Sequence, residues 1–157
     1  MGFRSWILGL LGGTEKEQET PAAPPPLRTR DPIEEEAAGL NFYTAIEAHQ
    51  KWKVRLMAVI EGDTSEGLSV EVIGRDDQCA LGKWIHGVGI RFAQAEEFTR
   101  LKKNHAFFHE CAAQVLRMAQ SGDKDSALEE LRRGTYSRAS NDVVQDLAVM
   151  YRRATQE

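Results

Sequence analysis

The sequence predicts an all-α protein, a helical bundle with three long helices and one short helix. Apolar residues recur at helical spacing through three long segments. Aspartates that can cap a helix precede three of the four predicted helices, and glycine-containing stretches separate them. With 157 residues, the chain is long enough for one domain with a real hydrophobic core.

This domain is expected to span residues 33–157, after an N-terminal segment, 1–32, of different composition. Residues 14–32 are first charged and then proline-rich, which favours a flexible, extended linker. Before them lies a short apolar stretch that Gly9 interrupts. It is short for the core of a signal peptide. Trp6 also stands where a myristoylation motif needs Ser or Thr.

The N-terminal apolar stretch has two interpretations that remain open. It is either a tail that docks transiently on protein, or a short amphipathic anchor making weak contact with a membrane or a partner. Its apolar side chains are Phe3, Trp6, Ile7, Leu10 and Leu11. No apolar run approaches the roughly 20 residues of a membrane span, and two cysteines suit a reducing compartment. We therefore expect a cytoplasmic protein, peripheral at the inner membrane under the second interpretation.

The first helix is predicted over residues 33–61, with Asp31 as its cap and Pro32 in its first turn. Residues 62–77 contain glycines and β-branched residues without a helical stripe, so they are predicted to be a connection. The connection is long for a loop, which indicates some local structure within it. The inward face of the first helix carries Phe42, Ile46, His49, Trp52, Leu56, Val59 and Ile60.

A short second helix is predicted to start at Gln78, after Asp77 as its cap, and to end at Gly87 or Gly89. Within it, Gly82 is expected to let another helix approach closely. Trp84 is expected to anchor this short element in the hydrophobic core.

Two long helices are predicted to complete the bundle. The third spans about 91–120, and the fourth, capped by Asp123, spans about 124–153. Gly134 weakens the fourth helix near its middle. The inward face of the third helix carries Phe98, Leu101, His105, Phe108, Ala112, Val115 and Ala119.

Three histidines and one cysteine are predicted to form a metal site. His105 and His109 are four residues apart, so they share one face of a helix. His49 and His105 lie in the middle of inward faces, where an unpaired polar ring costs about 1–3 kcal/mol. Cys79, expected in the first turn of the short helix, adds a thiolate that the helix dipole favours. Zn²⁺ prefers such a set, although imidazole also suits Cu, Ni and Fe.

The other candidates for chemistry are expected to be structural. Cys111 is predicted to lie on a different side of its helix from His109, as a packed small residue or a surface thiol. His86, beside glycines, is expected to be exposed or to cap a helix end. A net charge of −4 without a basic stripe argues against a nucleic-acid partner.

Three motifs in this chain resemble the chemoreceptor zinc-binding (CZB) domain family. They are HQKWK at 49–53, CALGKWI at 79–85 and HAFFH at 105–109. The Cys-x-Leu-Gly-x-Trp pattern is the most specific of them, and its order between the histidines also agrees. With the less distinctive GTYSRAS at 134–140, the resemblance covers roughly residues 39–153.

The resemblance implies a four-helix bundle with a zinc site formed by His49, Cys79, His105 and His109. It also implies a sensory role in bacterial signal transduction, in chemotaxis or cyclic-di-GMP signalling. Such domains are often fused to chemoreceptors or diguanylate cyclases, often form homodimers, and are linked to zinc inhibition and hypochlorous-acid sensing. This chain has no room for a signalling hairpin or a cyclase domain, so we expect a separate signalling protein as partner.

Two functions are therefore weighed. The first is a sensor that responds to zinc, to oxidants or to both, through oxidation of the Cys79 thiolate. The alternative is a structural zinc bundle that acts as an adaptor or dimerisation module. A site closed by four protein ligands has no open position for water, so we expect no enzymatic activity.

Overall fold

The structure, a computed structural model, describes residues 36–156 of the chain. Within this part the fold is all-α, as predicted, apart from one minimal β-hairpin. The elements, in chain order, are β1 (Glu36–Ala37), β2 (Leu40–Asn41), α1 (Phe42–Glu61), α2 (Val70–Ile73), α3 (Ala80–His86), the 3₁₀ helix η2 (Val88–Phe92), α4 (Glu96–Gln120), α5 (Lys124–Arg133) and α6 (Thr135–Ala154).

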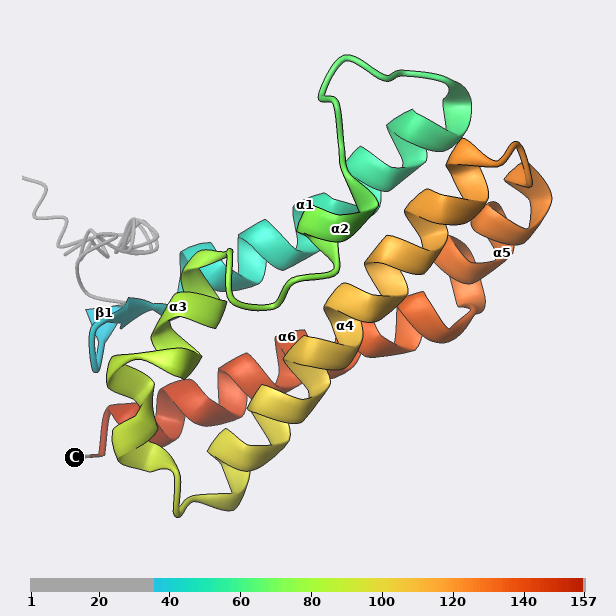
Figure 1. Ribbon diagram of the computed structural model, residues 1–157. Coiled ribbons are helices and arrows are strands. Elements are labelled where there is room, and N and C mark those ends of the chain that lie inside the picture. The colour runs from blue at the N-terminus through green and yellow to red at the C-terminus, as the bar shows by residue number, and fades with distance from the viewer. Residues whose placement is uncertain (1–35, 157) are drawn as a thin grey trace, which may run out of the picture.

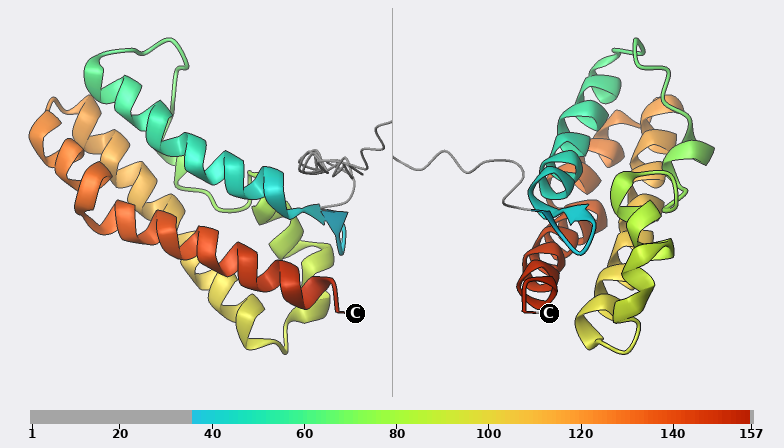
Figure 2. Two further views of the ribbon diagram at one scale, coloured as in Figure 1. Left: turned by 180° about the vertical axis from the view of Figure 1, so that it is seen from behind. Right: turned by 90° about the vertical axis from the view of Figure 1, so that its left-hand side faces the viewer.

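The three longest helices, α1, α4 and α6, lie side by side along the molecule, and α4 contacts both of the others (Figure 1). Helix α5 packs against all three at one end. The β-hairpin, α3 and η2 lie at the opposite end, as Figure 1 and the left view of Figure 2 show. The short helix α2 rests on α4. The three long helices therefore form the bundle. Helix α5 covers one end of it, and the hairpin, α3 and η2 cover the other.

Helix α1 begins at Phe42, nine residues later than the predicted start at 33. The chain before it pairs as an antiparallel hairpin, and its turn places Ala38 and Gly39 at φ values of 54° and 81°. Asn41 then caps the helix, because its side-chain oxygen accepts from the Thr44 N–H at 2.9 Å. The proposed cap Asp31 and Pro32 lie outside the described residues.

The fourth predicted helix is in fact two helices, α5 and α6, which meet at Gly134. Asp123 caps α5, as expected. Gly134 has extended backbone, and a Cβ there would lie 2.5 Å from Glu130 Cα. The Glu130 carboxylate accepts from the N–H groups of Thr135 and Tyr136 at 2.7 and 3.2 Å, so it satisfies the first donors of α6. The glycine and this carboxylate together end one helix and begin the next.

The start of the third predicted helix also differs from the structure, whereas the expected local structure in the connection is confirmed. The third helix starts at Glu96 rather than 91, because residues 88–92 wind into a separate 3₁₀ turn. The connection 62–77 does contain local structure, the single-turn helix α2 capped by Ser69. This turn is important for the site because it lies against α4.

Trp84 anchors α3 in the core, as predicted. Its ring is 3% exposed and packs against Phe42, Phe92 and Phe98 at centroid distances of 5.7, 6.0 and 5.9 Å. Its indole N–H also donates to the Ala38 carbonyl at 2.8 Å. These contacts tie α3 to the hairpin, α1 and α4, and so place the residue that precedes α3, Cys79.

Candidate metal centre

The structure brings all four predicted ligands together. His49 comes from the middle of α1, Cys79 from the N-terminus of α3, and His105 and His109 from α4. One ligand atom from each residue lies within 4.8 Å of all the others. The three histidines are at most 3% exposed, and Cys79 is half-buried. The cluster therefore sits inside the bundle, between α1 and α4.

The distances within the cluster suit a single ion. His105 Nε2 lies 3.1 Å from His109 Nε2 and 3.2 Å from Cys79 Sγ. In a tetrahedral zinc shell, with bonds of about 2.0–2.3 Å, neighbouring ligand atoms lie about 3.3–3.8 Å apart. These two distances are within a few tenths of an ångström of that range, whereas other pairs are separated by up to 4.8 Å. The side chains would therefore have to draw together by about 1 Å at the widest pair to bind one metal ion.

Two of the histidines are held in the orientation that metal binding requires. His49 Nδ1 donates to the Ala45 carbonyl at 2.6 Å, and His109 Nδ1 donates to the Ile73 carbonyl at 2.7 Å. Since a carbonyl only accepts, both rings carry their proton on Nδ1 and keep a lone pair on Nε2. His49 Nε2 is buried without a hydrogen-bond partner among the described residues. An unpaired buried acceptor facing a thiol and two imidazoles fits a metal ligand.

His105 is held differently from the other two. Its Nε2 faces the cluster, while its buried Nδ1 has no hydrogen-bond partner within residues 36–156. Packing must therefore orient this ring. The His49 and His109 rings provide part of that packing, with their centroids 5.3 and 4.7 Å from the centroid of His105. His105 is the candidate ligand with the least hydrogen-bond support.

Burial keeps the three imidazoles neutral. It lowers the pKa of His49 to about 4, against the opposing effect of the Ala45 carbonyl. It also lowers the pKa of His105 to about 2, aided by the nearby His109 and His49. The pKa of His109 is lowered by burial too, although its bond to Ile73 opposes this. All three rings are therefore in the metal-binding form at neutral pH.

Cys79 occupies the N-cap of α3, so the prediction that Asp77 caps this helix is wrong. The Gly82 N–H donates to Cys79 Sγ at 3.3 Å. Burial nevertheless raises the pKa of the thiol, and the Gly82 N–H only partly opposes it. Desolvation thus outweighs the backbone donors expected to favour the thiolate, and a bound metal ion would supply the missing stabilisation. Asp77 instead pairs with Arg75 at 2.8 Å.

Gly82 allows a close approach, but of a loop rather than of another helix. A Cβ on Gly82 would lie 1.6 Å from the Asp76 carbonyl oxygen. The backbone of residues 76–77 therefore crosses directly over α3 at this position. This contact sets the path of the chain that leads into Cys79.

The residues expected to be structural lie outside the cluster. His86 is exposed at the last position of α3, and its Nε2 lies 2.9 Å from an oxygen of Asp76. Cys111 is buried on α4, where it lines a shallow groove with Phe107 and Met118. The two groups that the sequence did not reveal are the carbonyls of Ala45 and Ile73. A backbone carbonyl has no residue-type signature, so only the fold could identify them.

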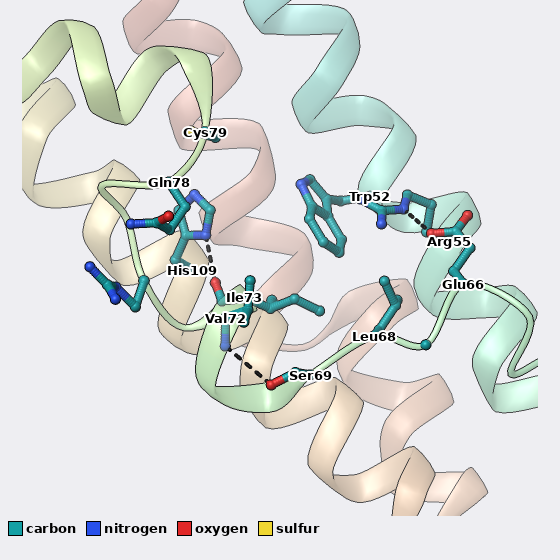
Figure 3. A pocket seen from close by; sticks show the side chains of 12 residues that line it. Trp52, Arg55, Glu66, Leu68, Ser69, Val72, Ile73, Gln78, Cys79 and His109 are labelled. Atoms are coloured by element: carbon teal, nitrogen blue, oxygen red, sulfur yellow. Dashed lines mark hydrogen bonds and ion pairs between the residues drawn. The ribbon is translucent and has the colours of Figure 1, made fainter.

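A cleft of about 360 Å³ opens onto one side of the cluster (Figure 3). Cys79 and His109 line it, together with Trp52, Arg55 and Glu66. The described part of the chain contains no helix that is both long and apolar enough to cross a membrane.

The comparisons with known proteins agree with the site. The family model described as chemoreceptor zinc-binding domain matches residues 49–116, a range that begins at His49 and includes Cys79, His105 and His109. Neither the comparison with curated proteins nor that with solved structures gave a significant match. Over this segment, which carries all four candidate ligands, the chain is similar to the chemoreceptor zinc-binding (CZB) domain family.

Proposed function

We propose that His49, Cys79, His105 and His109 bind one zinc ion, and that the domain is a sensor in bacterial signal transduction. The observation that carries the proposal is the convergence of three neutral imidazoles on a thiol in the protein interior. Two of the imidazoles are also oriented by hydrogen bonds from Nδ1 to backbone carbonyls. Such outer contacts are typical of histidines that bind metals.

Zinc is the ion that this donor set suits best. Three nitrogens and one thiolate sulfur fill a tetrahedral shell, whereas Mg²⁺ and Ca²⁺ need oxygen ligands. When bound, zinc would hold the four side chains together and deprotonate the thiol, with no position left for water. The proposal is therefore a binding and sensing role rather than hydrolysis.

Cys79 is the residue through which an oxidant would act. Attack of its thiolate on a peroxide breaks the O–O bond, leaves sulfenic acid on sulfur and releases the other oxygen as hydroxide or alcohol. A sulfenic acid is a weaker ligand than a thiolate, so the N-terminus of α3 would lose one of its attachments. Trp84 remains packed in the core. We expect the release to be confined to residues 74–80 rather than to unfold all of α3.

The output of the sensor is proposed from the family alone. We propose a separate chemoreceptor or diguanylate cyclase as partner, in chemotaxis or cyclic-di-GMP signalling, and a homodimer as the working form. Residues 3–11, whose contact with a membrane or a partner was predicted, lie outside the described residues.

Metal content tests the proposal. The full chain, purified without added metal, is expected to hold about one zinc per chain, as one closed four-ligand site requires. His49→Ala, Cys79→Ala and His105→Ala should each lose most of it. Cys111→Ala and His86→Ala serve as matched controls, because both remove a ligand-type side chain outside the cluster. Full zinc content in the three site variants would contradict the proposal and leave the cluster as core packing.

A structural zinc bundle is the second candidate, and the position of the cluster favours it. The ligands join α1 to α4 in the protein interior, where a metal ion can hold two long helices together. Circular dichroism of the metal-free chain separates the two functions. A sensor keeps most of its helix without metal, whereas a purely structural site does not.

A further inference from the structure

The candidate metal centre is closed on most sides but is open on one. The cleft described above lies between α1 and the segment 66–79. Of the described residues, those that line it include Cys79 and His109 but neither His49 nor His105. A molecule in the cleft would therefore meet the sulfur and one imidazole first, with the other two imidazoles behind them.

Trp52, Arg55 and Glu66 form one wall of this cleft, here called the outer wall. The Arg55 guanidinium lies 3.9 Å from the centroid of the Trp52 ring, and Arg55 Nε donates to the Glu66 carboxylate at 2.5 Å. Figure 3 shows Trp52 and Arg55 projecting from α1, with Gln78 and Cys79 across the cleft. The Arg55–Glu66 ion pair thus joins α1 to the loop after it, while the cation–π contact with Trp52 lies within α1 and helps to hold the guanidinium in place.

The ion pair of the outer wall is of a kind that breaks readily. The side chains of Arg55 and Glu66 are 35% and 49% exposed, so water and salt screen their attraction. The loop between α1 and α2, residues 62–69, has no buried side chain. Local opening of such segments costs less free energy than global unfolding.

The size and charge of the cleft indicate what could use it. Its volume is near the lower end of small-molecule sites, about 300–1,000 Å³, and is too small for a folded partner. Its two arginines are each paired, Arg55 with Glu66 and Arg75 with Asp77, so it presents no free cation among the described residues. This combination suits a hydrated metal ion or a small uncharged or chelating molecule rather than a polyanion.

We propose that this cleft is the route by which metal ions and small thiol-directed molecules reach the cluster, and that the outer wall controls the rate of that access. In this arrangement, Trp52 and Glu66 affect how fast the site exchanges or reacts and leave its equilibrium affinity unchanged. The part that concerns metal rests on the proposed zinc site; the part that concerns access to the Cys79 sulfur does not.

Alkylation of Cys79 by iodoacetamide in the metal-free full chain tests access directly. Modification at each cysteine is followed by peptide mass mapping. Trp52→Ala and Glu66→Gln should each accelerate Cys79 alkylation several-fold, because they remove the bulk and the ion pair of the outer wall. Val72→Trp, which adds bulk to an exposed side chain lining the cleft, should slow it.

Cys111 and Tyr43 provide the controls. Cys111 lies in a different groove on α4, so its alkylation rate reports any general loosening of the fold. Tyr43→Ala removes an exposed aromatic ring from α1 outside the cleft and should leave Cys79 unchanged. Equal Cys79 rates in all variants would overturn the proposal. A parallel rise at Cys79 and Cys111 would also overturn it, because the variants would then act by destabilising the protein.

Zinc transfer from the loaded chain to a chromophoric chelator gives the second measurement. Trp52→Ala should speed the transfer several-fold without changing the dissociation constant measured at equilibrium. A proportional loss of affinity would overturn the kinetic role of Trp52. If the wild-type chain binds no zinc, the proposed function fails, and the alkylation series still decides whether the cleft leads to Cys79.

Discussion

His109 Nδ1 donates to the Ile73 carbonyl at 2.7 Å, across 36 residues of sequence. The bond joins the last residue of the single-turn helix α2 to a candidate ligand on α4. A short element that has little stability of its own thus fixes the tautomer and orientation of a buried imidazole. The same contact makes α2 dependent on the ligand cluster and the ligand cluster dependent on α2.

This dependence can be tested at the cap of α2. Ser69 accepts from the Val72 N–H at 3.4 Å, a long bond, so Ser69→Ala should cost near the lower end of about 0.5–2 kcal/mol. We expect zinc affinity to fall a few-fold, because the Ile73 carbonyl is held less firmly. Ser69→Thr keeps the hydroxyl and is the matched control. Isothermal titration of both variants is the measurement, and equal affinity in Ser69→Ala would mean that α2 does not need its cap.

Gly82→Ala is expected to be among the most damaging small substitutions in the chain. The new Cβ would overlap the Asp76 carbonyl, and overpacking of this kind costs about 1–3 kcal/mol or more. Zinc binding should weaken as well, because relief of the clash displaces the backbone at position 82, whose N–H donates to Cys79 Sγ.

Gly122→Ala is the control for Gly82→Ala. Gly122 has a positive φ of 84° but open space around it, so alanine there adds backbone strain without a clash. Thermal unfolding of the metal-free variants should show a clearly larger loss for Gly82→Ala. A similar melting temperature for both would contradict the close approach at Gly82.

Asp146 is buried between α4 and α6 and supports the helix that carries two candidate ligands. It accepts from Arg100 at 2.5 Å and from Asn104, the neighbour of His105, at 2.8 Å. Arg100→Ala would leave the buried carboxylate with one donor and should cost about 1–3 kcal/mol. Lys103→Ala, on the same helix but without this contact, is the control. Urea unfolding measures both, and an unchanged midpoint for Arg100→Ala would contradict the prediction.

Metal removal should loosen one part of the chain rather than all of it. The contacts of Trp84 and the buried apolar residues of α6, which packs on both α1 and α4, do not involve the candidate ligands, so most helix should survive chelation. Hydrogen exchange is expected to accelerate at residues 70–80, which depend on His109 and Cys79 for attachment. Residues 143–150 of α6 serve as the internal reference. Uniform acceleration in both regions would favour the structural role of zinc.

The sequence predicted a helix correctly where its apolar spacing and its capping residue lie within one short segment. The predicted inward faces of α1 and α4 are buried or partly buried, and Asp123 caps α5. The errors occur where a tertiary contact decided the outcome. Asn41 replaces Asp31 as a cap because the preceding residues pair as a hairpin, and Glu130 caps α6 because Gly134 lets the chain turn beside it.

The sequence by itself determined the chemistry of the site, because imidazole and thiol groups and their helical spacing belong to single short segments. It determined that His49, His105 and His109 face inward and that Cys79 lies near the start of a short helix. Only the tertiary structure decided that Ala45 and Ile73 hold two of the rings by their carbonyls. It alone also decided that one side of the cluster opens to a cleft walled by Trp52, Arg55 and Glu66. Those features depend on how segments far apart in the chain pack against one another, and no local pattern encodes that packing.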